Sequence, residues 1–172
     1  HYEEIRQTGA NITLYNVPGR TGVDLLPSTV LRLIEKKNIT GIKEAVNTES
    51  RFKDLLEIKT IRPDFSLLSG DDPTFVSFMK LGADGIISVA ANVMPKQVKE
   101  LSDLCFSKEF EEAEKLNEKY LRLYELLFTE ASPSPCKFLL EKLSLLENNL
   151  RLPLHPLSEE FKEDIYEAFN EI

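Results

Sequence analysis

The feature that most constrains the fold is a unit of short strand, loop and helix that repeats along residues 1–99. Four short runs of β-branched and apolar residues predict strands, because each is bounded by Gly, Asn, Asp or Pro and is followed by a helical pattern. These runs are Ile12–Tyr15, Gly41–Glu44, Ser66–Ser69 and Gly85–Ser88. Strands that alternate with helices at this spacing form a parallel sheet with right-handed crossovers. The sequence therefore predicts an α/β fold.

Prolines mark where three of the connecting helices are expected to begin. Pro27, Pro73 and Pro95 each stand at the start of a helical pattern. Proline suits the first turn of a helix because that turn leaves its N–H groups unpaired and the ring already fixes a helical φ. Asp72 stands directly before Pro73, and we expect it to cap the helix that follows.

The pattern changes near residue 100, after which helical periodicity dominates. Residues 1–99 carry 13 basic and 12 acidic side chains, whereas residues 100–172 carry 8 basic and 17 acidic ones. We therefore expect two parts, one with the repeated units and one helical. The helices predicted for the second part are Lys96–Phe106, Phe110–Phe128, Cys136–Leu146 and a last one that Ser158 caps and that ends near Asn170.

Composition argues against several classes of protein. A net charge of −8 disfavours a surface for nucleic acid or for anionic membranes. No apolar run approaches the roughly 18 residues of a membrane span. The two cysteines, Cys105 and Cys136, are too few for a disulfide framework or a zinc site, which indicates a reduced, cytoplasmic setting. The sequence shows no phosphate-binding glycine loop, zinc-ligand spacing or nucleophile elbow.

The end of the first predicted strand carries two candidate site residues. Tyr15 is followed by a loop that contains Arg20, and the active sites of parallel sheets collect at the carboxyl ends of strands. A phenol can relay a proton, and a guanidinium can bind a carboxylate through two hydrogen bonds. From the spacing alone, a packed tyrosine and a solvated turn arginine remain the alternative.

Lys43, in the second predicted strand, is a sharper candidate. Lysine is uncommon in strands, and a charged group inside a sheet is costly unless it has a function. An amine in a desolvated site loses its proton more readily, so it can attack a keto acid and form a Schiff base. The alternative is a lysine near a strand end that reaches solvent. After the third strand, Gly70 would let a substrate approach the backbone closely.

Together, these segments resemble the dihydrodipicolinate synthase family, whose members condense pyruvate with aspartate semialdehyde on the route to diaminopimelate and lysine. Four motifs in the family's order carry the resemblance, and they are YNVPGRTG (Tyr15–Gly22), GIKEA (Gly41–Ala45), LLSGDD (Leu67–Asp72) and GADGIISVAANVMP (Gly82–Pro95). The likeness covers essentially the whole chain, including SPSPCK at Ser132–Lys137. One motif alone would be a weak signal, whereas four in register are a strong one.

The resemblance implies a role for each candidate residue. Lys43 matches the lysine that forms the Schiff base with pyruvate, and Tyr15 matches the tyrosine that shuttles protons. Arg20 matches the arginine that binds the carboxylate of aspartate semialdehyde, and Gly70 and Ile87 match positions whose backbone carbonyls line the pyruvate pocket. The resemblance implies no metal and no organic cofactor. It also implies a cytoplasmic homo-oligomer, either a dimer or a tetramer.

The resemblance also chooses between the two architectures that four strand–helix units allow, an open doubly wound sheet and half of a (β/α)8 TIM barrel. It implies the C-terminal half, with strands five to eight in residues 1–99 and the last barrel helix and a helical region in residues 100–172. The chain starts at His1, and Tyr2–Ile5 already matches the family. We therefore expect the first four units to be missing, together with the family's threonine pair, its intersubunit tyrosine and its lysine-feedback site. Such a chain would be a poor catalyst that self-associates through open strand edges.

Two other functions stay open from the sequence. Another pyruvate-dependent aldolase, such as N-acetylneuraminate lyase or a keto-deoxy-sugar acid aldolase, would share Tyr15 and Lys43. Arg20 argues against it, because an arginine there suits a short aldehyde with a carboxylate better than a sugar chain. The remaining alternative is a catalytically dead half-barrel that acts only as a folding or assembly module.

Overall fold

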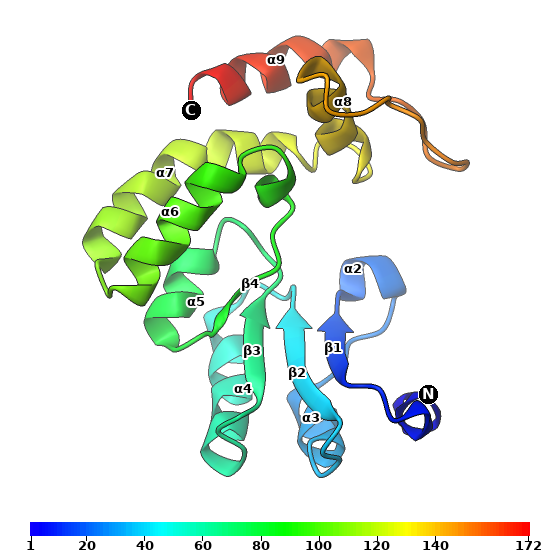
Figure 1. The fold of residues 1–172 in the computed structure, drawn as a ribbon, viewed down its shortest axis with the longest axis vertical. Helices are drawn as coiled ribbons and strands as arrows, with labels where there is room; N and C mark the ends of the chain where they lie inside the picture. The colour runs from blue at the N-terminus through cyan, green and yellow to red at the C-terminus, as the bar shows by residue number, and fades with distance from the viewer. The chain divides into compact units, whose positions relative to one another are not determined.

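The computed structural model describes residues 1–172 and the side chains of all of them except Glu3 and Arg6. Two compact units make up the chain, residues 1–87 and residues 88–172. The first unit contains the β-sheet, and the second is built from helices (Figure 1). Among the described residues, no helix is long and apolar enough to cross a membrane.

The described residues of the first unit form one four-stranded parallel sheet. Its strands are β1 (Ile12–Asn16), β2 (Ile39–Glu44), β3 (Ser66–Ser69) and β4 (Gly85–Ile86). They lie side by side in sequence order, so every crossover advances in the same direction. A doubly wound sheet reverses direction at a switch point, and this sheet does not. The predicted α/β class, strands and parallel pairing are confirmed, and the strand order favours the barrel alternative.

The predicted fourth strand is longer than the observed one. β4 ends at Ile86, two residues before the predicted end at Ser88, because its partner β3 ends at Ser69, opposite Ile86. One further ladder hydrogen bond follows, in which the Ile87 N–H donates to the Ser69 carbonyl at 2.9 Å. The end of the partner strand β3, which the sequence of the fourth run does not contain, therefore coincides with the end of β4.

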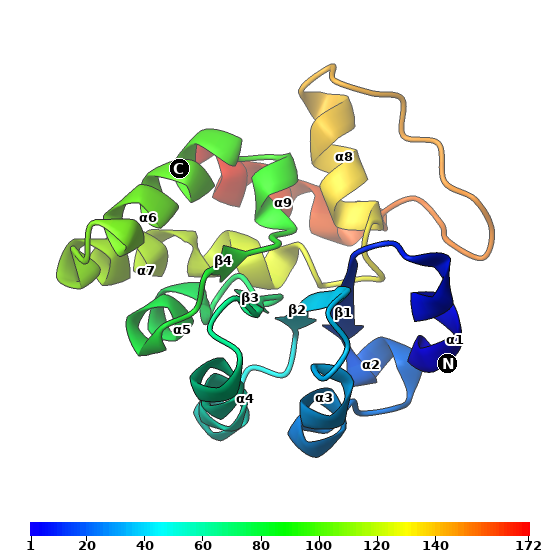
Figure 2. The same cartoon turned by 60° about the horizontal axis from the view of Figure 1, so that its bottom comes forward.

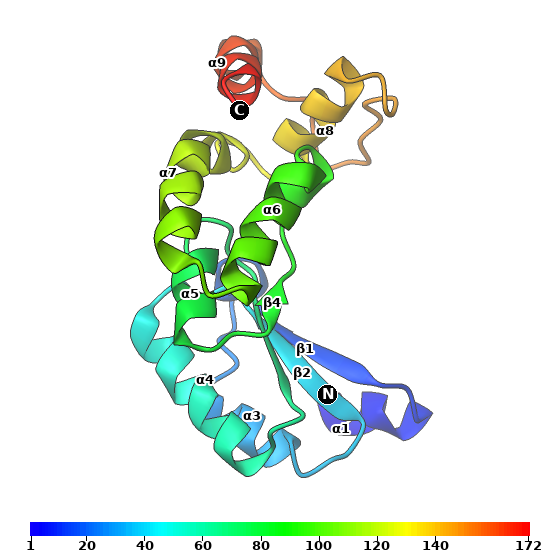
Figure 3. The same ribbon diagram turned by 60° about the vertical axis from the view of Figure 1, so that its left-hand side comes forward.

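The helices of the first unit connect successive strands. They are α1 (Tyr2–Ile5), the 3-10 helix η1 (Arg6–Thr8), α2 (Pro18–Thr21), α3 (Pro27–Leu33), α4 (Glu49–Ile61) and α5 (Phe75–Leu81). α3, α4 and α5 lie on one side of the sheet in the view that brings the lower end of the strands forward (Figure 2). A view closer to the sheet edge shows α3 and α4 on the same side of β1 and β2 (Figure 3). One face of the sheet is therefore covered by helices of its own unit.

Side-chain alternation along the strands builds the core on that covered face. Leu14, Ile42 and Leu67 are buried and belong to one apolar cluster with residues of α3, α4 and α5. Within the cluster, the rings of Phe52 and Phe78 stack with centroids 4.1 Å apart. Because successive strand residues point to opposite faces, the residues next to Leu14, Ile42 and Leu67 along each strand point to the other face.

Arg62, which directly follows α4, forms several hydrogen bonds at the amino-terminal end of the sheet. Its guanidinium donates hydrogen bonds to the carbonyls of Ile34, Lys36 and Ile39 at 2.6–3.1 Å and to that of Lys37 at 3.0 Å. These carbonyls belong to the end of α3, to the turn that follows it and to the first residue of β2. Arg62 thus ties the residue after α4 to the connection between α3 and β2. Nothing in the sequence singled this residue out.

The expected helix starts are right in two of three cases. α3 begins at Pro27 and α6 (Pro95–Phe106) begins at Pro95, with proline in the first turn of each. α5 instead begins at Phe75, after the N-cap Thr74, so the prediction that Asp72 caps it is wrong. Asp71 instead binds this N-cap residue, because its carboxylate accepts the Thr74 N–H at 3.1 Å and the Thr74 hydroxyl at 2.6 Å.

The second unit packs its helices in pairs. It contains the 3-10 helix η2 (Ala90–Asn92), α6, α7 (Phe110–Leu126), α8 (Ser134–Lys142) and α9 (Glu159–Asn170). α6 packs against α7, and α9 packs against both α7 and α8. Fully buried apolar side chains such as Leu123, Leu139 and Ile165 come from α7, α8 and α9. The four helices predicted after residue 95 are observed, with some of their ends shifted.

α8 begins and ends earlier than the predicted Cys136–Leu146. It ends at Lys142, and Ser144 then adopts a left-handed φ of 57°. Leu145 and Leu146 are exposed, at 68% and 36%, so a further helical turn would bury no apolar surface there. Apolar residues that find no packing partner do not extend a helix.

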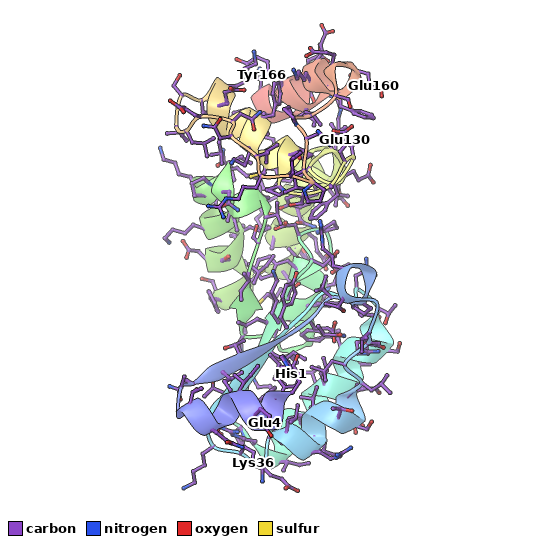
Figure 4. All side chains as sticks on the ribbon, turned by 90° about the vertical axis from the view of Figure 1, so that its right-hand side faces the viewer. His1, Glu4, Lys36, Glu130, Glu160 and Tyr166 are labelled. Atoms are coloured by element: carbon purple, nitrogen blue, oxygen red, sulfur yellow. The ribbon has the colours of Figure 1, made fainter. Side chains whose placement is uncertain are left out.

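α9 is capped by a carboxylate from elsewhere in the unit. Ser158 is the N-cap residue, as predicted, but its hydroxyl donates to Glu130 at 2.5 Å instead of accepting from the helix. Glu130 also accepts the Ser158 N–H at 3.1 Å, and both hydrogen bonds lower the pKa of this carboxyl. Figure 4 labels Glu130 and, on the first turn of α9, Glu160.

Candidate active site

Tyr15 and Lys43 meet at the carboxyl ends of β1 and β2. The parallel register pairs Tyr15 with Lys43, so both side chains leave the sheet on the face opposite the α3–α5 helices. The Lys43 Nζ lies 4.3 Å from the centroid of the Tyr15 ring, a cation–π distance. Tyr15 is 45% exposed and Lys43 is half-buried. The structure thus brings an amine and a phenol ring together on an accessible face.

Gly70 follows β3 and gives the Lys43 side chain its space. Its N–H donates to the Glu44 carbonyl at 2.7 Å, which extends the β2–β3 ladder by one residue. A Cβ on Gly70 would lie 2.9 Å from Lys43 Cε and 3.0 Å from the Glu44 carbonyl oxygen, closer than real Cβ atoms pack. We expected a substrate to approach Gly70, and the group that does so here is the aliphatic stem of Lys43.

Ile87 and Arg20 lie at the same end of the sheet but do not contact the amine. The Ile87 N–H is bonded to Ser69, directly before Gly70. Arg20 is on α2, the short helix that follows β1, and it is exposed. Among the described residues, its guanidinium forms no hydrogen bond or ion pair with Tyr15 or Lys43.

Four polar residues beneath the site were missed by the sequence analysis. Asn16 follows Tyr15 in β1, Glu44 follows Lys43 in β2, Asp24 lies after α2, and Arg51 is on the first turn of α4. These four are called the strand-end network. Asn16 and Glu44 are 2% and 0% exposed, and polar groups at core-facing strand positions are costly unless they are paired. A polar residue at a core-facing strand position, directly after a candidate site residue, is the sequence signal that would have identified Asn16 and Glu44.

Hydrogen bonds join the strand-end network into one unit. The Asn16 Nδ2 donates to both Glu44 carboxylate oxygens at 3.0 Å and to Asp24 Oδ1 at 2.9 Å. Arg51 donates to both Asp24 oxygens, at 2.8 and 2.5 Å, and lies 3.4 Å from Glu44 Oε2. The Val46 N–H donates to Glu44 Oε1 at 2.7 Å. The buried carboxylate of Glu44 therefore has a donor on each of its oxygens.

The electrostatics of the strand-end network differ between its two acids. Burial raises the pKa of Glu44, although the Val46 N–H, the Asn16 amide and Arg51 act in the opposite direction. The hydrogen bonds from Arg51 lower the pKa of Asp24 to about 2. Asp24 is thus an anion at neutral pH that neutralises much of the Arg51 charge.

Comparisons with known proteins agree on one family. The model of the dihydrodipicolinate synthetase family matches residues 1–172. The 4-hydroxy-tetrahydrodipicolinate synthase of Pelodictyon phaeoclathratiforme is 44% identical over 165 residues, which are 94% of this chain and 55% of the relative. That of Buchnera aphidicola subsp. Schizaphis graminum is 45% identical over 156 residues, which are 90% of this chain and 52% of the relative.

Solved structures agree with the sequence relatives. Dihydrodipicolinate synthase from Thermotoga maritima has a TM-score of 0.95 at 40% identity and covers 99% of this chain and 59% of its own. The chloride-inhibited enzyme from Acinetobacter baumannii, in complex with pyruvate, has a TM-score of 0.93 at 41% identity and covers 99% and 58%. The chain spans about half the length of the curated relatives it matches. On both sequence and structure, the chain belongs to the dihydrodipicolinate synthetase family.

Proposed function

We propose that this chain carries the imine-forming site of a 4-hydroxy-tetrahydrodipicolinate synthase, which condenses pyruvate with aspartate semialdehyde in the diaminopimelate route to lysine. The observation that carries the proposal is the Lys43 amine beside the Tyr15 ring at the carboxyl end of a parallel sheet. The names of the relatives and the pyruvate complex of the Acinetobacter baumannii enzyme support it.

Lys43 supplies the nucleophile in this proposal. Its unprotonated Nζ attacks the keto carbon of pyruvate, and the resulting carbinolamine loses water to give an imine. The imine draws electrons from the pyruvate methyl group, which loses a proton to form an enamine. The enamine carbon then attacks the aldehyde carbon of aspartate semialdehyde, whose amino group later displaces Lys43 as the ring closes. No organic cofactor is required, because the imine itself accepts the electrons.

The other site residues handle protons and charge. We assign the phenol of Tyr15, whose ring centroid lies 4.3 Å from the Lys43 Nζ, to protonating the carbinolamine hydroxyl as that group leaves as water. Arg20 is exposed and unengaged by Tyr15 and Lys43 on the helix after β1, which suits it to the carboxylate of the second substrate. The backbone carbonyls of Gly70 and Ile87 are assigned to the wall of the pyruvate pocket.

The architecture that goes with this function is the C-terminal half of a (β/α)8 barrel. β1 to β4 would be barrel strands five to eight, in residues 1–99, and residues 100–172 would add the last barrel helix and the helical region. The one-way strand order and the half-length match to the relatives support this assignment. A cytoplasmic homo-oligomer is proposed on the family resemblance alone.

The proposal is tested by trapping the imine. The chain is incubated with pyruvate, reduced with borohydride, digested and analysed by mass spectrometry. We expect the adduct on Lys43, its loss in Lys43→Ala, and its retention in Lys53→Ala, a matched change at an exposed lysine of α4. An adduct on Lys80 or Lys96, or no adduct at all, would contradict the assignment.

The second substrate is tested through Arg20. Removing a charged hydrogen-bond donor costs about 1.5–3 kcal/mol. Arg20→Ala should therefore slow the reaction of the enamine with aspartate semialdehyde by roughly ten- to a hundredfold. Imine formation with pyruvate should survive, and Arg32→Ala on α3 is the control. Equal loss of pyruvate trapping would show that Arg20 serves pyruvate, and faster turnover with sugar aldehydes would favour the aldolase alternative.

A further inference from the structure

We propose that the strand-end network is a positioning device that holds Tyr15 and Lys43 together and fixes the loop that carries Arg20. This inference rests on the proposed function, because it assigns the network to the imine-forming step. Asn16, Asp24, Glu44 and Arg51 are positioning residues here, since none of them contacts the Lys43 amine in the structure.

The first step is the register of the two strand ends. Asn16 and Glu44 are paired across β1 and β2, one residue beyond the pair Tyr15 and Lys43. The two hydrogen bonds from the Asn16 amide to the Glu44 carboxylate therefore cross-link the strands directly beneath the site. Sliding one strand along the other would break both hydrogen bonds and would separate the amine from the ring.

The second step is the loop that carries Arg20. The Asn16 side chain donates to Asp24 Oδ1 at 2.9 Å and accepts the Leu25 N–H at 2.9 Å through its own Oδ1. These two hydrogen bonds close the segment Val17–Val23, which contains α2 and Arg20, onto the end of β1. Arg51 then ties Asp24 to α4 through two hydrogen bonds. One amide thus connects the segments that carry Tyr15, Lys43 and Arg20.

The third step is the choice of side chains. Glu44 is fully buried, and its neighbours along the covered face of the strands, Leu14 and Ile42, are apolar. An apolar side chain of similar size would be cheaper to bury there than a carboxylate, and replacing buried polar networks by packed apolar residues is often neutral for stability. A polar network at this place therefore indicates selection for geometry, because its hydrogen bonds admit only one arrangement.

The experiment distinguishes a role of the network in positioning Tyr15 and Lys43 from a role in the stability of the fold. The double variant Asn16→Leu, Glu44→Met replaces the cross-link by apolar packing, and the control Glu130→Met breaks a side-chain interaction in the second unit. Two quantities are measured for the full chain and each variant. One is the rate of borohydride trapping at saturating pyruvate, and the other is the ring-current shift that the Tyr15 ring imposes on the Lys43 Cε protons, observed by NMR with isotope-labelled lysine.

The network predicts a specific pattern. The folded double variant should lose the ring-current shift and should trap pyruvate roughly a hundredfold more slowly, as expected for a displacement of about 1 Å. Its half-saturating pyruvate concentration should stay within about twofold, because these residues do not bind the substrate. Glu130→Met should change neither quantity. If the double variant does not fold, Glu44→Gln, which keeps the shape and the Val46 hydrogen bond, should give intermediate values of both.

Failure of this inference and failure of the proposed function give different results. A folded double variant, or Glu44→Gln, with the full ring-current shift and the parental trapping rate overturns the positioning role and leaves the function intact. A parental chain that shows the shift but traps no pyruvate overturns the function. In that case, retention of the shift in the variants overturns the positioning role as well, and its loss supports the role.

Discussion

The two ends of the sheet use polar side chains in opposite ways. At the amino-terminal end, the Arg62 guanidinium donates hydrogen bonds to four backbone carbonyls between Ile34 and Ile39, and it also forms an ion pair with Asp64. At the carboxyl end, the Lys43 amine lies over the Tyr15 ring, and the hydrogen bonds of the strand-end network lie one residue away. One end uses a charged group to stabilise the fold, whereas the other leaves an amine available for chemistry.

This difference indicates how a small sheet combines stability with reactivity. The Arg62 guanidinium carries no free electron pair and serves through its hydrogen bonds, whereas an amine that is to act as a nucleophile has to stay accessible and contributes little to folding. Stabilising the fold and carrying the reactive amine are therefore assigned to opposite ends of the strands. At the carboxyl end they are also assigned to opposite faces of the sheet, with the strand-end network on one face and Lys43 on the other. Substitutions at the two ends should therefore affect different measurements.

The largest expected effect is on stability, from Arg62→Ala. This change leaves four carbonyls without their donor and should lower the free energy of unfolding by about 3 kcal/mol, the upper range for hydrogen bonds to a charged group. Urea unfolding measures it, with Arg122→Ala at an exposed arginine as the control. Pyruvate trapping by the folded variant should be unchanged, and a loss of trapping would show that the two ends are not independent.

The next effect is on reactivity, from Gly70→Ala. The added Cβ displaces the Lys43 stem, so imine trapping should slow by roughly a hundredfold. The unfolding free energy should change less than in Arg62→Ala, because the closest contact is with the flexible Lys43 stem and the Glu44 carbonyl oxygen, 3.0 Å from the added Cβ, has to shift only slightly. Gly19→Ala is the matched control, since a Cβ there meets nothing within 4 Å. Parental trapping in Gly70→Ala would show that the close approach of Lys43 is unimportant.

The smallest effect is on the pH dependence of stability, from Asp24→Asn. The folded pKa of Asp24, about 2, lies below its ordinary value of 3.8, so its contribution is present above pH 3.8 and is lost as pH falls toward 2. Glu44, whose pKa is raised, acts above that window and with the opposite sign. Urea unfolding between pH 4 and 2 should therefore be less pH-dependent in Asp24→Asn, whereas Arg62→Ala should keep the parental slope.

Much of the first unit could be predicted from the sequence because its signals are local. The four strands follow from short β-branched runs between turn residues, and two helix starts follow from Pro27 and Pro95. The proximity of Tyr15 and Lys43 follows from parallel pairing, since both stand at strand ends on the same face. A repeated unit fixes neighbours in space without any long-range information.

The features that could not be predicted depend on residues far apart in the chain. Arg62 acts on carbonyls more than twenty residues earlier, and Glu130 caps a helix that begins at residue 159. The end of α8 depends on whether Leu145 finds a packing partner, which no local pattern contains. In each case, the local structure depends on a partner that is distant in the sequence and not on the residue alone.

The alternation at the strand ends also sets which changes of chain length an evolving sequence can tolerate. In β2, Lys43 faces the open side and Glu44 faces the helices. A single-residue insertion or deletion within the strand would turn the carboxylate outward and drive the lysine into the apolar core, since a shift of one residue exchanges the two faces. A change in the length of the loops before or after the strand does not change which of its side chains face the helices. Insertions and deletions among descendants of this chain should therefore accumulate in those loops and be absent from the strand.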